Sequence, residues 1–86
     1  MKIIKINAMW CPGCLITKSI WQEIEKEYPS HEYISLDYDL DEEKIAKYKI
    51  GDILPVVIIE NNNQEIKRII GEKNKKEILK ELEDLL

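Results

Sequence analysis

The sequence predicts a single α/β domain with a four-stranded mixed sheet and three helices, in the order β-α-β-α-β-β-α. Short β-branched segments alternate along the chain with segments in which apolar residues recur every three or four positions. This alternation is typical of strands that alternate with helices. The chain has only 86 residues, so we expect one domain that spans residues 1–86.

The first part of the chain predicts a strand, a helix and a second strand. Residues 2–8 begin with alternating Lys and Ile, a pattern typical of a strand. Over residues 12–28 apolar side chains recur every four positions, which marks one face of a helix. Pro29 ends this helix because a proline disfavours helical geometry in the residue before it. Residues 32–38 form the second strand, and a right-handed crossover would make the two strands parallel.

The middle of the chain predicts a short acidic helix and then a hairpin. Asp39 or Asp41 can cap a helix that runs to about Lys49. The apolar run 55–59 has the composition of a strand that is buried on both faces. A run of asparagines then forms a turn, and residues 64–70 form the antiparallel partner strand nearer the sheet edge.

The end of the chain predicts a third helix. Asn74 and Glu77 have the spacing of a capping box, which marks the beginning of a helix. Helices would then cover both faces of the sheet. The apolar stripe of the last helix consists of Ile78, Leu79, Leu82, Leu85 and Leu86.

Composition and charge argue against several classes of partner. The net charge is −4 and the two signs are interspersed, whereas a nucleic-acid partner would need a basic stripe. No apolar run approaches the roughly 18 residues that span a membrane. The N-terminal segment stops at Asn7 without the long apolar region or the cleavage site of a signal peptide. We therefore expect a cytoplasmic protein with no nucleic-acid and no membrane partner.

The chain contains two cysteines, Cys11 and Cys14, placed just before and inside the first turn of the long helix. Thiols are kept reduced in the cytoplasm, so a lone pair there indicates catalysis or metal binding instead of a structural disulfide. Backbone N–H groups and the helix dipole favour a thiolate at Cys11. Cys14 lies about one turn further on and could attack a mixed disulfide formed on Cys11. The spacing thus predicts reversible exchange between dithiol and disulfide.

Two alternatives remain open for the cysteine pair. A closed zinc site needs four ligands, and the chain offers only these two cysteines and His31, which follows the helix. We therefore expect no metal site within one chain, although a dimer could supply four thiolates to zinc or to an iron–sulfur cluster. The other alternative is a redox-inert binding module.

The order of motifs resembles the thioredoxin superfamily. Residues 8–14 look like its active-site segment, residues 48–59 like the segment with its cis-proline, and residues 63–71 like its last hairpin. The resemblance implies a thioredoxin fold and a monomeric thiol–disulfide oxidoreductase that acts on protein or small-molecule disulfides. It also implies a thiol reductase as electron donor and no bound organic cofactor.

The resemblance implies a role for each site residue. Cys11 would be the catalytic nucleophile, and Cys14 the thiol that resolves the mixed disulfide. A cis bond would precede Pro55, and the backbone of Leu54 would pair with an extended substrate segment. Trp10 would be half-exposed beside the cysteines. The expected substrate-binding residues are Trp10, Pro12, Leu54 and Pro55.

Three positions depart from the family pattern. Pro12-Gly13 stands where thioredoxins have Gly-Pro and glutaredoxins have Pro-Tyr. The glutathione-binding signals of glutaredoxins, Thr-Val-Pro and a later Gly-Gly, are missing, so glutathione is not expected as a cofactor. Lys5 occupies the position of a buried Asp that serves the second cysteine in thioredoxins.

Lys5 would be costly to bury without a partner. Asp37 on the neighbouring predicted strand is the expected partner. We hypothesise that Lys5, alone or paired with Asp37, tunes the electrostatics beneath the cysteines and so the pKa of the thiols. The alternative is that the ammonium of Lys5 reaches solvent at the edge of the strand.

Overall fold

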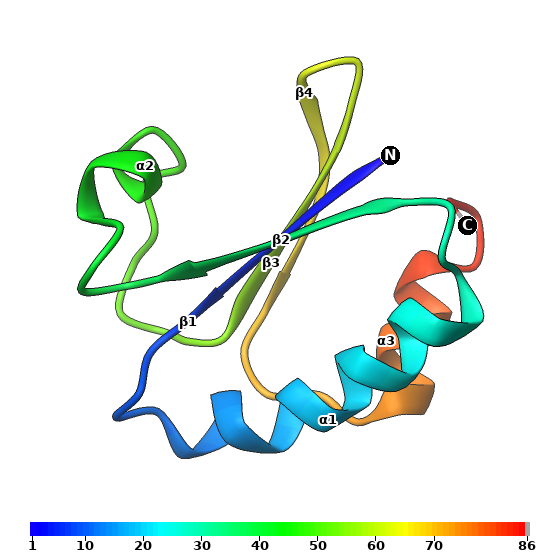
Figure 1. Ribbon diagram of the computed structural model, residues 1–86, viewed down its shortest axis with the longest axis horizontal. Coiled ribbons are helices and arrows are strands. Elements are labelled where there is room, and N and C mark those ends of the chain that lie inside the picture. Colours follow the sequence, from blue (N-terminus) through cyan, green and yellow to red (C-terminus); the bar gives the residue numbers. More distant parts are fainter. Residues whose placement is uncertain (86) are drawn as a thin grey trace.

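The computed structural model describes residues 1–85, and these contain the predicted elements in the predicted order (Figure 1). The predicted fold class is confirmed. Leu86, which belongs to the predicted stripe of the last helix, lies outside the described residues. The elements are β1 (Lys2–Asn7), α1 (Pro12–Glu27), β2 (Glu32–Asp37), α2 (Glu42–Ala46), β3 (Val56–Asn61), β4 (Gln64–Ile70) and α3 (Lys75–Leu82).

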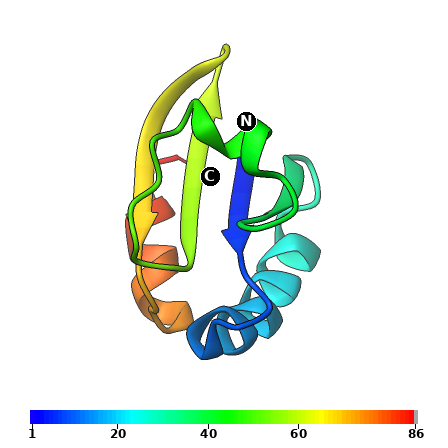
Figure 2. The ribbon, with the colours of Figure 1, turned by 90° about the vertical axis from the view of Figure 1, so that its left-hand side faces the viewer.

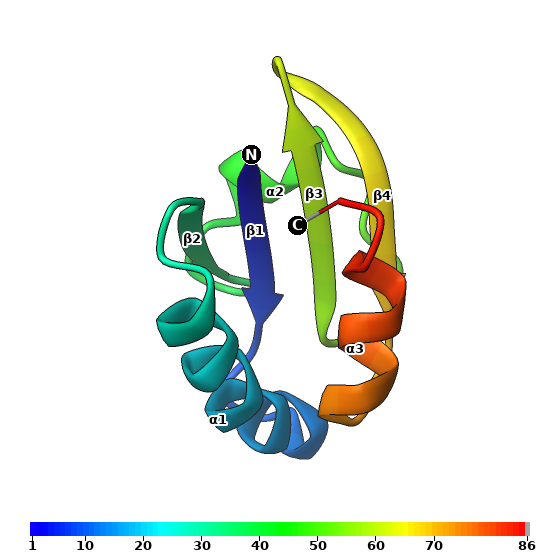
Figure 3. The same ribbon diagram turned by 90° about the vertical axis from the view of Figure 1, so that its right-hand side faces the viewer.

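The four strands form one mixed sheet in the order β2-β1-β3-β4, which Figure 3 shows from the side of α1 and α3. β1 and β2 are parallel, with Asn7 opposite Asp37 at their carboxyl ends. β3 runs antiparallel to both β1 and β4. The central position of β1 brings the loop after Asn7, which carries both cysteines, to the middle of one sheet edge.

Helices cover both faces of the sheet, with α1 and α3 on one face and α2 on the other (Figure 1). β3 is buried on both faces, as its apolar run predicts, because alternate side chains enter the two cores. Each fully buried Ile or Leu contributes about 1.5–3 kcal/mol through removal of apolar surface from water. The core under α1 and α3 contains Ile3, Trp21, Ile24, Val57, Ile59, Ile69, Ile78 and Leu82. The core under α2 contains Ile4, Ile6, Ile45, Tyr48, Val56 and Ile58.

The helix ends agree with two of the sequence signals and depart from a third. α1 ends before Pro29, and the predicted capping box of α3 is present, with Glu77 N–H donating to the Asn74 side chain at 2.8 Å. α2 ends at Ala46, three residues before the expected end. Asp41 is its N-cap, but its carboxylate accepts the N–H of Asp37 at 2.8 Å and makes no capping hydrogen bond to the helix. The missing side-chain cap agrees with a helix of little more than one turn.

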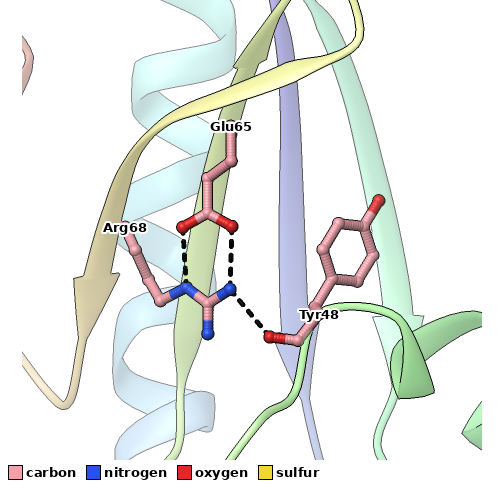
Figure 4. A network of polar contacts seen from close by, with 3 residues as sticks. All are labelled: Tyr48, Glu65 and Arg68. Carbon is pink, nitrogen blue, oxygen red and sulfur yellow. Dashed lines mark hydrogen bonds and ion pairs between the residues drawn. The ribbon is translucent and has the colours of Figure 1, made fainter.

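The segment between α2 and β3 is fastened to β4 by Arg68 (Figure 4). The guanidinium donates to both carboxylate oxygens of Glu65, at 2.9 and 2.8 Å, and to the backbone carbonyl of Tyr48 at 2.8 Å. The next residue, Lys49, has a positive φ of 53°. This left-handed conformation costs about 1–2 kcal/mol for a residue with a side chain. The bonds of Arg68 help to offset that cost, and so they fix the beginning of the segment that leads to Pro55.

Candidate active site

Cys11 is the N-cap residue of α1, with an extended backbone (φ −97°, ψ 109°). Its Sγ accepts a hydrogen bond from the backbone N–H of Cys14 at 3.2 Å. Pro12 follows in the first turn, where its missing N–H leaves no intrahelical bond unmade. The first turn of α1 therefore directs an N–H group at the sulfur of Cys11, as an anion site at a helix N-terminus does.

Cys14 is the more deeply buried of two free thiols, with 3% of its surface exposed against 6% for Cys11. Burial raises the pKa of Cys14 from an ordinary 9.0 to about 11, and the hydrogen bond and charge of Cys11 act in the same direction. A backbone hydrogen bond involving Ala8 opposes them. The thiol of Cys14 is therefore protonated at neutral pH.

The Leu54–Pro55 segment lies against the cysteine helix, as the resemblance implies. The peptide bond before Pro55 is cis. Leu54 packs against Ala8, Cys11 and Cys14. The Cδ of Pro55 lies 3.6 Å from the point where a Cβ on Gly13 would stand. Cys11, Cys14, Leu54 and Pro55 thus form one cluster, although 39 residues separate Cys14 from Leu54.

Trp10 covers the edge of this cluster. Its indole is 59% exposed, as expected, and its Nε1 donates to the carboxylate of Asp39 at 2.8 Å. The ring also stands edge-on to Tyr38, with 6.0 Å between ring centroids. Met9, the residue before Trp10, is 84% exposed, and Ile53, the residue before Leu54, is 61% exposed. The buried thiols are therefore bordered by an exposed apolar rim.

The partner of Lys5 is Glu25 on α1, and the prediction of Asp37 is wrong. Lys5 Nζ lies 2.6 Å from Glu25 Oε2, and only 13% of the Lys5 side chain is exposed. Lys5 stands opposite Ser35 in the parallel register, so Asp37 lies two residues further along β2. There its carboxylate accepts the N–H groups of Asp39 and Leu40, at 2.9 and 3.0 Å. Asp37 thus stabilises the turn after β2, and Lys5 has a largely buried side chain whose ammonium is paired with Glu25.

A cleft of about 550 Å³ runs along α1 and connects the surroundings of Cys14 with those of Lys5. Its helix wall extends from Cys14 through Lys18 and Gln22 to Glu25. This distance corresponds to about 16 Å at 1.5 Å per residue. The Lys5–Glu25 pair therefore lies near one end of the cleft and Cys14 near the other.

Two partner residues of the site were missed by the sequence interpretation. The sequence predicts Asp39 only as a possible helix cap and assigns no role to Glu25. The available signal for Asp39 was its place just after the predicted second strand, because the carboxyl ends of neighbouring parallel strands meet at one sheet edge. Glu25 has no comparable signal, since its contact depends on how α1 crosses the sheet.

Within residues 1–85, no group of three or more His, Cys, Asp and Glu side chains is arranged to hold a metal ion. None of the helices in this part of the chain is long and apolar enough to cross a bilayer.

The chain matches the family model of thioredoxin over residues 1–84. Thioredoxin from Mycobacterium tuberculosis is 31% identical over 85 residues, covering 98% of this chain and 72% of the relative. Thioredoxin H5 from rice (Oryza sativa subsp. japonica) is 29% identical over 69 residues, covering 80% of this chain, which spans half of that relative's length. The solved structure of Plasmodium falciparum thioredoxin has a TM-score of 0.90 at 22% identity, covering 99% of this chain and 81% of that one.

The chemistry of the cysteine pair agrees with the family to which the relatives belong. Two free thiols separated by two residues at a helix N-terminus, beside a cis-proline, can pass between dithiol and disulfide. This is the chemistry of a thiol–disulfide oxidoreductase, and the named relatives support it. The chain belongs to the thioredoxin family.

Proposed function

We propose that the protein reduces disulfides through a reversible Cys11–Cys14 disulfide, with Cys11 as nucleophile and Cys14 as resolving thiol. The observation that carries this assignment is the asymmetry of the two sulfurs. Cys11 accepts the N–H of Cys14 at the beginning of α1, whereas the pKa of the buried Cys14 is raised to about 11. The first sulfur is thus placed where a backbone N–H can stabilise a thiolate as it forms, and the second remains a protonated thiol at neutral pH.

The reaction has two exchange steps. The thiolate of Cys11 attacks one sulfur of the substrate disulfide, forms a mixed disulfide and releases the other sulfur as the first thiolate. The sulfur of Cys14 then attacks the sulfur of Cys11, which forms the Cys11–Cys14 disulfide and releases the second substrate sulfur. The proton of Cys14 passes to a departing thiolate, so two electrons and the proton reach the substrate together.

We propose that substrate binds across the first turn of α1 and the Leu54–Pro55 segment. Trp10 and Pro12 are exposed beside Cys11, and Leu54 packs on the cysteine cluster. The backbone of Leu54 would pair with an extended segment of the substrate, as in β-strand addition. Pro55 would shape the floor of this groove.

Thioredoxins generally act with a thioredoxin reductase and on protein disulfides. A relative from Mycobacterium leprae, 30% identical over 98% of this chain, is named a bifunctional thioredoxin reductase/thioredoxin. We propose a thiol reductase as the electron donor, protein or small-molecule disulfides as substrates, and a monomer that works in the cytoplasm. No resident organic cofactor is required, because the electrons are carried by the two thiols, and glutathione is not proposed as a cofactor.

We also propose that Lys5 tunes Cys14 through the cleft that both residues line. The support is the shared cleft and the low exposure of the Lys5 side chain, 13%. Because Glu25 neutralises the ammonium at 2.6 Å, the net field at Cys14 is that of an ion pair. The effect on the pKa of Cys14 should therefore be small until one partner is removed.

Turnover of insulin disulfides, with dithiothreitol as reductant, tests the proposed function. The wild-type protein should accelerate the precipitation of reduced insulin, and Cys11→Ser should reduce the rate to that of dithiothreitol alone. A Cys11→Ser variant that kept its turnover would overturn the assignment. Visible absorbance or bound metal in freshly purified protein would favour a thiolate-bridged dimer instead.

A further inference from the structure

The connection between β4 and α3 places an acidic side chain, Glu72, against the first turn of α1 (Figures 2 and 3). Its Cβ and Oε2 lie 3.3 and 3.5 Å from the point where a Cβ on Gly13 would stand. The same point is 3.6 Å from Cδ of Pro55. The residue before Glu72, Gly71, donates its N–H to the carbonyl of Pro55 at 2.8 Å. Glu72 therefore stands at the junction of the cysteine helix and the Leu54–Pro55 segment.

The carboxylate of Glu72 is available to a substrate. Glu72 is exposed, and the ion pairs formed within residues 1–85 use other carboxylates. The nearest ion-paired cation along the chain, Lys75, contacts Glu27 at 2.9 Å and Glu23 at 3.8 Å, both on α1. No side-chain contact within the described chain therefore neutralises Glu72.

The rest of the rim contains no cation. The segments that meet at the thiols are residues 8–14, 53–55 and 71–72. Their one charged side chain is that of Glu72, and the other members are apolar residues, cysteines or glycines. Exposed apolar side chains beside an unpaired carboxylate complement a ligand that is itself apolar and positively charged.

We propose that Glu72 is a specificity-determining residue that favours disulfides with a positively charged group next to the reactive sulfurs. The proposal rests on the oxidoreductase function and leaves its chemistry unchanged. Two thiols of the protein become a disulfide, and the substrate disulfide becomes two thiols. Glu72 acts on the encounter and on the mixed disulfide by attraction between opposite charges. An exposed ion pair of this kind changes a rate constant by about two- to fivefold.

Three small dialkyl disulfides test this assignment with the reduced full-length protein. They are cystamine, which is cationic, 2-hydroxyethyl disulfide, which is neutral, and 3,3′-dithiodipropionate, which is anionic. Second-order rate constants for oxidation of the protein are measured at low ionic strength by acid quenching and separation of the two redox forms. The variants are Glu72→Gln and Glu72→Lys. Glu32→Gln is the matched control, since Glu32 is an exposed residue at the opposite end of the sheet.

Glu72→Gln should lower the rate constant for cystamine by about two- to fivefold and raise that for dithiodipropionate by a similar factor. Glu72→Lys should change the ratio of the two rate constants by roughly tenfold or more, and added salt should shrink both effects. The control and all rates with the neutral disulfide should stay close to wild type. If the ratio of the cystamine and dithiodipropionate rate constants were unchanged in both variants while the neutral disulfide reacted normally, the role of Glu72 would be overturned and the proposed function would stand. Failure of the wild-type protein to react with all three disulfides would overturn the proposed function.

Discussion

The indole Nε1 of Trp10 donates to the carboxylate of Asp39 at 2.8 Å and so joins the cysteine loop to the turn after β2. This bond fixes the exposed ring that borders Cys11. The turn is itself held by Asp37, whose carboxylate accepts the N–H groups of Asp39 and Leu40. The position of Trp10 thus depends on the acidic turn after β2, which lies outside the cysteine loop.

Asp39→Ala should loosen the indole of Trp10 because the ring loses its hydrogen-bond acceptor. We expect a small loss of unfolding free energy, about 0.5–1.5 kcal/mol, and a higher KM for insulin reduction. Urea denaturation and steady-state kinetics measure the two effects. Asp39→Asn is the matched control because its amide oxygen can still accept the bond. If the alanine variant had wild-type KM and stability, Asp39 would have no positioning role.

Lys5 and Glu25 should behave as a coupled pair. Glu25→Gln leaves a partly buried ammonium without a counter-charge, so it should lower unfolding free energy by about 1–3 kcal/mol. The remaining positive charge should also lower the pKa of Cys14, by roughly 0.5 or less at this separation. Lys5→Met leaves a lone carboxylate and should raise that pKa.

The double variant, Lys5→Met with Glu25→Gln, should return the pKa of Cys14 close to its wild-type value. Thiol alkylation rates across pH, measured in a Cys11→Ser background, report this pKa for all four proteins. Identical titrations in the four proteins would end the proposal that Lys5 tunes Cys14. A loss of stability in Glu25→Gln would still stand as evidence for the ion pair.

The raised pKa of Cys14 predicts a specific pH dependence of stability in the reduced protein. A thiol whose pKa rises from 9.0 to about 11 on folding binds its proton more tightly in the folded state. Its contribution is fully present below pH 9, falls as pH rises from 9 towards 11, and is lost above that.

Urea unfolding of reduced wild type and of Cys14→Ala, followed from pH 8 to 11, isolates this contribution. As pH rises, the unfolding free energy of wild type should fall relative to that of Cys14→Ala. The oxidised protein is the control, because its Cys14 carries no proton and should lack this component. A pH-independent difference between the reduced proteins would contradict the assignment.

Arg68→Met should weaken the attachment of the segment that leads to Pro55. The variant loses the bond to the Tyr48 carbonyl and the paired bonds to Glu65 (Figure 4). Because these groups are partly exposed, we expect a loss of about 1–2 kcal/mol at pH 7. The Arg68 hydrogen bond lowers the pKa of Glu65, so the contribution of the pair is lost as pH falls below the usual range of a glutamate.

Denaturation of wild type and Arg68→Met at pH 7 and at pH 3 measures this difference. The gap in unfolding free energy should narrow at the lower pH. Glu65→Gln is the companion variant, since it keeps a hydrogen-bond acceptor but removes the charge. An equal gap at both pH values would show that Glu65 plays no electrostatic part.

Local sequence signals were enough for the elements and for the cysteine pair. The capping box at Asn74 and the stop at Pro29 depend on neighbouring residues alone, so they can be read without the fold. α2 ends before the predicted residue because the chain tightens after Ala46 into turns in which Tyr48 and Lys49 donate to the carbonyls three residues back, and Lys49 has a positive φ. The cis bond before Pro55 came from the family resemblance, since composition does not indicate it.

Long-range partners could not be predicted in the same way. Pairing of Lys5 with Glu25 requires the crossing of α1 over the sheet, and the contact of Glu72 with Gly13 requires α1 and the β4–α3 connection to meet. Both contacts join segments that are distant in sequence, and neither leaves a periodic signal. Lys5, Glu25 and Glu72 are therefore features of this site that the spacing of the two cysteines does not indicate.

Mass spectrometry of a trapped intermediate tests the central claim, the division of roles between Cys11 and Cys14, most directly. The reduced Cys14→Ser and Cys11→Ser variants are each treated with 2-hydroxyethyl disulfide at neutral pH, and adducts are located by peptide mapping. Cys14→Ser should accumulate a stable mixed disulfide on Cys11, whereas Cys11→Ser should react far more slowly, because the pKa of Cys14 is about 11. Adduct formation on Cys14 as fast as on Cys11 would contradict the account.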